Sequence, residues 1–140
     1  MKKTILLLIA TIFLTALAYT QTRGTIYRAN QWIDCSEMGG KFNPALFDKA
    51  MENPIFEKVE ILVTDKFIKA TFGTKIYKYS ILSIKEKSAS EVTTYFVSLG
   101  NKKYELSISD MSVINQGTAI GLEGYWFVFG IKNIQQVQLK

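Results

Sequence analysis

The chain has 140 residues, of which 48% are hydrophobic and 21% charged, and its formal net charge is +5. It contains one cysteine and no histidine. This composition excludes Ser-His and Cys-His nucleophile pairs, histidine-based zinc or copper sites and thiolate metal clusters. We therefore expect a non-enzymatic protein with no catalytic residue, metal ligand or cofactor.

The first 18 residues, MKKTILLLIATIFLTALA, predict a secretory signal peptide. Two lysines precede an apolar run, and Ala16-Leu17-Ala18 has the small residues of a cleavage site. A membrane anchor is the alternative, but the run is shorter than the about 20 apolar residues that span a bilayer. No cysteine comes directly after the cleavage site, so we expect a secreted or periplasmic protein that is not a lipoprotein.

Removal of the first 18 residues leaves residues 19–140, which we expect to form a single β-rich domain. This part has 15 basic and 12 acidic residues, a net charge of +3. Nucleic-acid binding usually shows as a clustered basic face, whereas the lysines here are scattered between acidic residues. We expect neither a nucleic-acid partner nor a transmembrane span after cleavage.

The first third of this domain combines short strands with one helix. Residues 23–37 have the composition of one or two strand segments, and Gly39-Gly40 follows as a flexible joint. A helix is predicted near residues 44–52, with Asn43 as N-cap and Pro44 in its first turn. Leu46, Phe47, Ala50 and Met51 form one apolar face of this helix, which we expect to pack on the sheet.

Beyond residue 54 the hydrophobic pattern has a period of two with frequent turn residues, which predicts an antiparallel meander. The expected core faces are Val59, Ile61 and Val63; Ile68, Ala70 and Phe72; Tyr95, Val97 and Leu99; and Tyr104, Leu106 and Ile108. Tyr77, Tyr79 and Ile81 share a face, but Leu82 and Ile84 fall on the other. This change of phase predicts a bulge or a sharp bend.

The last aromatic run, EGYWFVFGI at residues 123–131, is expected to close the core. Alternation places Tyr125, Phe127, Phe129 and Ile131 on the core face and Trp126 and Val128 on the opposite face.

We therefore expect a mainly β fold with about seven strands and one short helix. It would be a small antiparallel meander barrel or a strongly curved sheet, with an α+β roll as the alternative. A signal peptide followed by a small meander resembles the secreted lipocalin-like barrels in architecture, although the sequence has Asn30-Gln31-Trp32 and no Gly-x-Trp there. An outer-membrane barrel of about eight strands would also fit the length. Lys58, Glu60, Lys103 and Glu105, which alternate with apolar residues, argue against that alternative.

Aromatic residues are the most prominent candidates for binding. The chain has nine Phe, seven Tyr and two Trp. Tyrosines on an inner face suit a cavity for an apolar or amphipathic small molecule, because such pockets combine apolar walls with a few polar groups. The candidate ligand-binding residues are Tyr77, Tyr79, Tyr95, Tyr104, Tyr125, Phe127 and Phe47. In this hypothesis Gly39-Gly40 would hinge the helix as a lid.

The alternative to a small ligand is a protein partner that binds an outer sheet face or an exposed edge, with Trp126 or Phe67 as the anchor. Asp34 and Glu37 could act as general acid or base beside Trp32, but their spacing does not favour catalysis over a polar strand end. Cys35 is expected to be buried and inert.

Overall fold

The computed structural model describes residues 22–85, 92–110, 117–131 and 133–139. The predicted signal peptide lies outside these residues. Ten strands form one antiparallel sheet, with a 3-10 turn η1 (Ser36–Met38) and a helix α2 (Pro44–Met51) beside it. The strands are β1 (Thr22–Ala29), β2 (Ile33–Asp34), β3 (Val59–Thr64), β4 (Phe67–Phe72), β5 (Lys75–Lys85), β6 (Val92–Leu99), β7 (Lys102–Asp110), β8 (Thr118–Leu122), β9 (Trp126–Ile131) and β10 (Asn133–Leu139).

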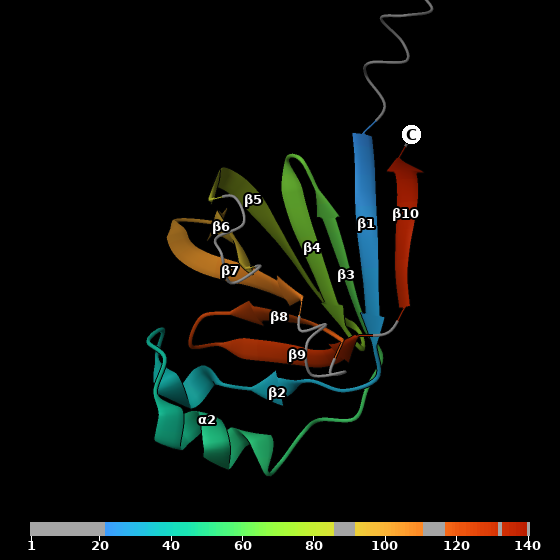
Figure 1. The fold of residues 1–140 in the computed structure, drawn as a ribbon. Helices are drawn as coiled ribbons and strands as arrows, with labels where there is room; N and C mark the ends of the chain where they lie inside the picture. Colours follow the sequence, from blue (N-terminus) through green and yellow to red (C-terminus); the bar gives the residue numbers. More distant parts are fainter. Residues whose placement is uncertain (1–21, 86–91, 111–116, 132, 140) are drawn as a thin grey trace, which may run out of the picture.

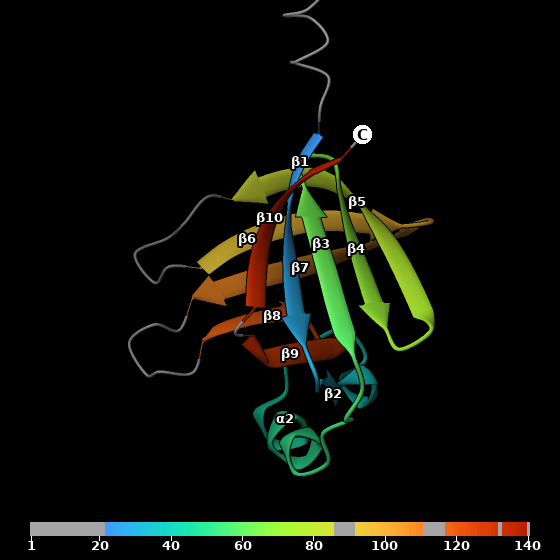
Figure 2. The same cartoon turned by 90° about the vertical axis from the view of Figure 1, so that its right-hand side faces the viewer.

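The strand order is β10-β1-β3-β4-β5-β6-β7-β8-β9-β2, so β3 to β9 form a continuous meander. The sheet bends strongly, so that β8, β9 and β2 lie crosswise to β1 and β10 (Figure 1). Figure 2 shows β6, β7 and β8 crossing β1, β3 and β4 in the same way. The sheet is not closed, which confirms the curved sheet in place of the barrel. Periodicity predicts about seven strands, fewer than the described residues form. It misses β2, which is very short, and β10, which lacks an alternating pattern.

The core lies on the inner face of this bent sheet. The alternating sets predicted for β3, β4, β6 and β7 all contribute to it. Ile61, Ile68, Val97 and Leu106 are fully buried. The predicted irregularity in β5 is confirmed, because its pairing with β6 shifts between Ile81 and Ser83.

The strand β9 turns its side chains to the faces opposite to those expected. Trp126 and Val128 are buried in the core, whereas Phe127 and Phe129 are half-buried outside it, so the predicted assignment is wrong for all four. Because Tyr125 to Phe129 are all apolar or aromatic, alternation cannot choose between the faces, and a shift of one residue exchanges them.

Tyr125 and Ile131 do face the core as predicted, but neither does so through the regular alternation of β9. Tyr125 lies in the turn before β9 and packs against the core from there. Ile131 returns to the core after an irregularity in the β8–β9 pairing, where Gly130 has a φ of 67°. A bulge of this kind changes the phase of the strand by one residue.

The helix α2 forms where the sequence predicts it. Asn43 Oδ1 accepts hydrogen bonds from the backbone N–H groups of Ala45 and Leu46 at 3.1 and 3.2 Å, which satisfies two free donors of the first turn. None of the eight residues of α2 is buried; Leu46, Phe47 and Ala50 are half-buried. The helix lies outside the sheet, next to β2 (Figure 1).

A candidate ligand cleft on the outer face

The predicted tyrosines form a chain of contacting rings on the inner face. Ring centroids are 6.4 Å apart for Tyr77 and Tyr79, 6.0 Å for Tyr79 and Tyr104, and 5.1 Å for Tyr104 and Tyr125. Tyr95 is half-buried against the same core. Four of the five predicted tyrosines are thus brought together, and their rings pack on one another.

Tyr79 is the most deeply buried of these residues, with 2% of its surface exposed. Its hydroxyl accepts a hydrogen bond from Trp126 Nε1 at 3.3 Å. Burial raises the pKa of Tyr79, although the hydrogen bond from Trp126 opposes this effect, and burial also raises the pKa of Tyr95. Burial therefore favours the neutral form of both hydroxyls over the ionised form.

Phe47 and Phe127, which were predicted to line the same cavity, lie on the other side of the sheet. Their ring centroids are 5.3 Å apart with planes inclined at 75°, so helix α2 is attached to β9 by an edge-to-face aromatic contact. Phe127 also stacks on Phe129 at 6.2 Å. The predicted ligand-binding set is thus divided between two faces.

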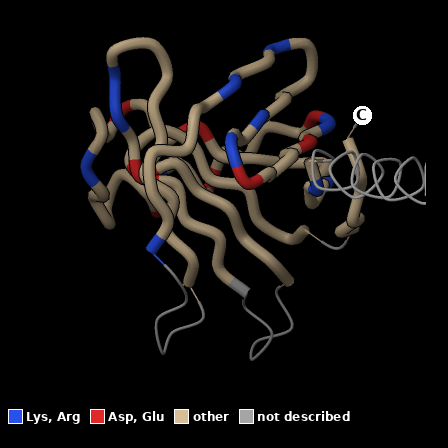
Figure 3. Tube along the Cα trace, turned by 90° about the horizontal axis from the view of Figure 1, so that it is seen from above, with Lys and Arg blue, Asp and Glu red and all other residues tan. Residues whose placement is uncertain are grey.

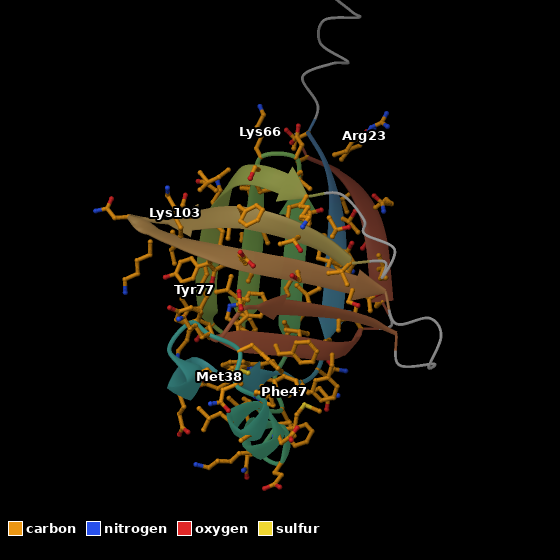
Figure 4. All side chains as sticks on the ribbon, turned by 60° about the vertical axis from the view of Figure 1, so that its left-hand side comes forward. Arg23, Met38, Phe47, Lys66, Tyr77 and Lys103 are labelled. Atoms are coloured by element: carbon orange, nitrogen blue, oxygen red, sulfur yellow. The ribbon has the colours of Figure 1, made fainter. Side chains whose placement is uncertain are left out.

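A cleft of about 450 Å³ lies beside the Phe47–Phe127 contact. It is bordered on one side by Met38, Phe42 and Phe47, and Figure 4 shows Met38 and Phe47 on the segment below β8 and β9. The opposite side is the outer face of β7, β8 and β9. The lining residues are Cys35, Met38, Phe42, Phe47, Glu105, Ser107, Ser109, Ala119, Gly121, Leu122, Glu123, Gly124, Trp126 and Phe127.

Small residues on two neighbouring strands form the floor of this cleft. Ser107 pairs with Gly121, and Ser109 pairs with Ala119. A Cβ atom on Gly121 would lie 3.0 Å from Cδ2 of Phe127, so glycine allows that ring to lie close to the strand. Larger side chains at these positions would occupy the space between the sheet and residues 38–47.

The segment that borders the cleft is held to the sheet by a close backbone contact. A Cβ atom on Gly124 would lie only 2.5 Å from the carbonyl carbon of Gly40. Gly40 N–H also donates a hydrogen bond to Gly124 O at 3.4 Å. Gly39 and Gly40 both have positive φ, but only Gly39 has open space around it. The predicted flexible joint is therefore attached at Gly40.

Two smaller clefts adjoin the first. One of about 330 Å³ includes Leu82, Phe96 and Lys103 and shares Glu105 and Glu123 with the larger cleft. Two of the predicted ligand-binding residues, Tyr104 and Tyr125, also line it. The other, of about 260 Å³, lies between η1 and α2 and shares Cys35 and Met38 with it. Open space thus lies on both sides of the segment that carries Met38 and Phe47.

Among the described residues, the two charged side chains that line the larger cleft are both acidic. Leu106 pairs with Leu122, so Glu105 and Glu123 occupy the next opposite positions, where Glu123 N–H donates to Glu105 O at 2.9 Å. Both side chains are exposed, and within the described residues neither forms an ion pair. Basic residues elsewhere are distributed over several turns and strands (Figure 3).

The residues considered for acid-base chemistry have structural partners. Asp34 Oδ1 accepts a hydrogen bond from Ser36 N–H at 2.9 Å, and Glu37 forms an exposed ion pair with Lys49 at 3.7 Å. Cys35 is 4% exposed and free, and burial, with a smaller contribution from Asp34, raises the pKa of its thiol. A raised pKa disfavours the reactive thiolate.

The predicted anchors for a protein partner occupy different environments. Trp126 is buried, with its ring 5.1 Å from that of Phe72, so it cannot serve as an exposed anchor. Phe67 is half-buried on β4, and the ammonium of Lys78 lies 4.3 Å from its ring centroid.

Comparison with known protein families, curated proteins and solved structures finds no match to this chain. Among the described residues no group of three or more acidic or cysteine side chains could hold a metal ion, and no helix is long and apolar enough to cross a membrane.

The sequence did not indicate the floor of the cleft. The alternation of Tyr104, Leu106 and Ile108 predicts only that Ser107 and Ser109 face outward. The two glycines of residues 121–124 are not followed by the helix that a phosphate site requires, so they predict no site. The sequence does show that these outward residues are all small. Small residues on adjacent strands leave space under a neighbouring helix.

Proposed function

We propose that the protein is an exported, non-enzymatic binding protein that holds an apolar or amphipathic small molecule in the outer cleft. One observation carries this proposal: the cleft has about 450 Å³ between residues 38–47 and the small-residue floor of β7 and β8. That volume is within the range of ligand pockets, and its walls combine aromatic side chains with a few polar groups.

The attachment of α2 supports the same function. A helix with no buried residue and with clefts on both sides can move by a small amount without exposing the core. Phe42, which is 58% exposed, would lose much of this exposed apolar surface when a ligand filled the cleft.

Binding can be tested with N-phenyl-1-naphthylamine, an uncharged apolar dye whose fluorescence rises on transfer from water. We expect saturable binding to the purified protein. Ser107→Leu places a large side chain in the cleft and should weaken dye binding at least about tenfold. A tenfold change in affinity corresponds to about 1.4 kcal/mol. Ser80→Leu places the same side chain on β5 outside the described clefts and serves as the control.

The proposal fails if the unmodified protein does not bind the dye, or if Ser107→Leu and Ser80→Leu bind it equally well. Circular dichroism of both variants would establish that each is folded. N-terminal sequencing of the protein from its own host tests the export part; we expect the mature chain to begin at Tyr19.

A second candidate is a protein partner at the free edge of β10. This strand pairs with β1 on one side, and none of the described strands pairs with the other. Its sequence NIQQVQL has no charge and no proline, two usual protections of an edge, and Ile134 is 48% exposed. Ile134→Lys should abolish any strand-mediated association, measured by light scattering after size-exclusion chromatography. A monomeric unmodified protein with no co-purifying chain would contradict this candidate.

A further inference from the structure

The most informative feature of the cleft beyond its volume is the pair Glu105 and Glu123. Like charges at directly opposite positions of an antiparallel pair destabilise a sheet. The two exposed carboxylates stand at such positions, Glu105 on β7 and Glu123 directly after β8, and no ion pair within the described residues compensates them. A cation between them would remove this repulsion.

The charge of the cleft also differs in sign from that of the chain. The whole chain has 17 basic and 12 acidic residues, yet the described residues that line the larger cleft include two glutamates and no basic residue. Lys103 borders only the smaller neighbouring cleft, and Figure 4 shows it toward the tip of the β6–β7 hairpin, away from Met38 and Phe47.

The glutamates lie where the larger cleft and the cleft of about 330 Å³ meet, because both clefts include them. Apolar surface lies on each side: Phe42, Phe47 and Phe127 line the larger cleft, and Leu82 and Phe96 line the smaller one. A molecule with a charged group at the glutamates can therefore extend its apolar part over aromatic surface.

We infer that the ligand of this cleft is a cationic amphiphile, with its positive group between Glu105 and Glu123 and its apolar part under residues 38–47. This inference rests on the proposed function. Opposite charge at the rim raises the affinity for cations and excludes anionic amphiphiles of the same length.

The test uses three amphiphiles of equal chain length, n-octyltrimethylammonium, n-octyl glucoside and n-octyl sulfate, each below its micelle concentration. Isothermal titration calorimetry should show the cation binding about five- to tenfold more tightly than the neutral glucoside, a modest factor because the carboxylates are exposed. The sulfate should bind most weakly. The preference for the cation should decrease at high salt concentration.

The double variant Glu105→Gln/Glu123→Gln should bind all three compounds with affinities within about a factor of two, the change expected when exposed ion pairs are removed. The matched control, Asp48→Asn/Asp65→Asn, removes the same charge at exposed positions that line none of the described clefts. It should keep the preference.

The possible failures are distinguishable. Equal binding of all three amphiphiles by the unmodified protein, with loss in Ser107→Leu, overturns the cationic ligand and leaves the cleft as the binding site. A preference for the cation that persists in the glutamate double variant also overturns the inference. Failure of every amphiphile and of the neutral dye to bind overturns the proposed function itself.

Discussion

On the inner face of the sheet aromatic rings contact one another in a chain, whereas on the outer face Phe47 and Phe127 meet at the border of a cleft. Strand β9 supplies both faces, with Trp126 turned inward and Phe127 outward. The difference lies in the neighbours. The inner rings pack on one another, and only Tyr104 and Tyr125 of this chain also border a cleft, the one of about 330 Å³. On the outer face Phe127 lies against Gly121 and lines the larger cleft with Ser107. Aromatic residues therefore form a packed core or a cleft according to what lies opposite them.

The largest expected effect comes from truncating the two aromatic residues of β9. Trp126→Ala should lower the free energy of unfolding by about 3–5 kcal/mol, the usual cost of deleting a large buried aromatic side chain. Phe127→Ala should cost less than half as much, because the residue is only half-buried, but it should weaken dye binding. Urea denaturation measures both, and equal losses would show that the two faces are packed alike.

The next effect concerns the attachment of residues 38–47. Gly124→Ala should lower the free energy of unfolding by about 2 kcal/mol, because a positive φ costs about 1–2 kcal/mol for alanine and its Cβ would meet the Gly40 backbone. Dye binding should weaken with it.

Gly100 provides the control for this prediction. It has a φ of 61°, but no atom of the described residues lies within 4 Å of an added Cβ. Gly100→Ala should therefore show the backbone cost alone, about 1 kcal/mol, and leave dye binding unchanged. If both variants weaken binding equally, the contact between Gly40 and Gly124 does not position the segment.

A smaller effect should follow from the hydrogen bond inside the core. Tyr79→Phe leaves Trp126 Nε1 without its acceptor, which should cost about 1 kcal/mol. Because burial raises the pKa of Tyr79 above its ordinary value, the neutral form is favoured in the folded state. The contribution of neutral Tyr79 to the free energy of unfolding is complete below the ordinary tyrosine pKa, about 10. It is lost as the pH rises through the pKa of Tyr79 in the folded protein.

The pH dependence can be measured by comparing Tyr79→Phe with the unmodified protein. The unmodified protein should lose stability more steeply above about pH 10, and the difference between the two curves isolates Tyr79 from the lysines that titrate in the same range. Parallel curves would show that Tyr79 ionises without cost and is not held in a packed core.

The regular strands could be predicted because each has one apolar and one polar face. In β7, Tyr104, Leu106 and Ile108 alternate with charged or small residues, so the inner face was unambiguous and the structure confirms it. The helix could be predicted for a local reason as well, since Asn43 and Pro44 define its start. These signals depend on residues close together in the sequence.

The cleft could not be predicted because it depends on which residues meet across the fold. In β9 both faces are apolar, so only the pairing with β8 and the cover provided by Phe47 decide that Phe127 lies outside. The floor joins Ser107 to Gly121 across two strands. The opposition of Glu105 and Glu123 likewise results from strand register, which single-strand periodicity does not specify.

The smallest expected effect on stability is that of the helix cap, and it tests whether α2 moves independently of the core. Asn43→Ala removes the acceptor for two backbone N–H groups, a change that costs a helix about 1 kcal/mol. Because none of the residues of α2 is buried, the helix can fray without opening the inner face. We therefore expect faster amide exchange in residues 44–51, weaker dye binding and a change of less than about 0.5 kcal/mol in global unfolding. A global loss equal to the full cost of the cap would mean that α2 unfolds only together with the sheet.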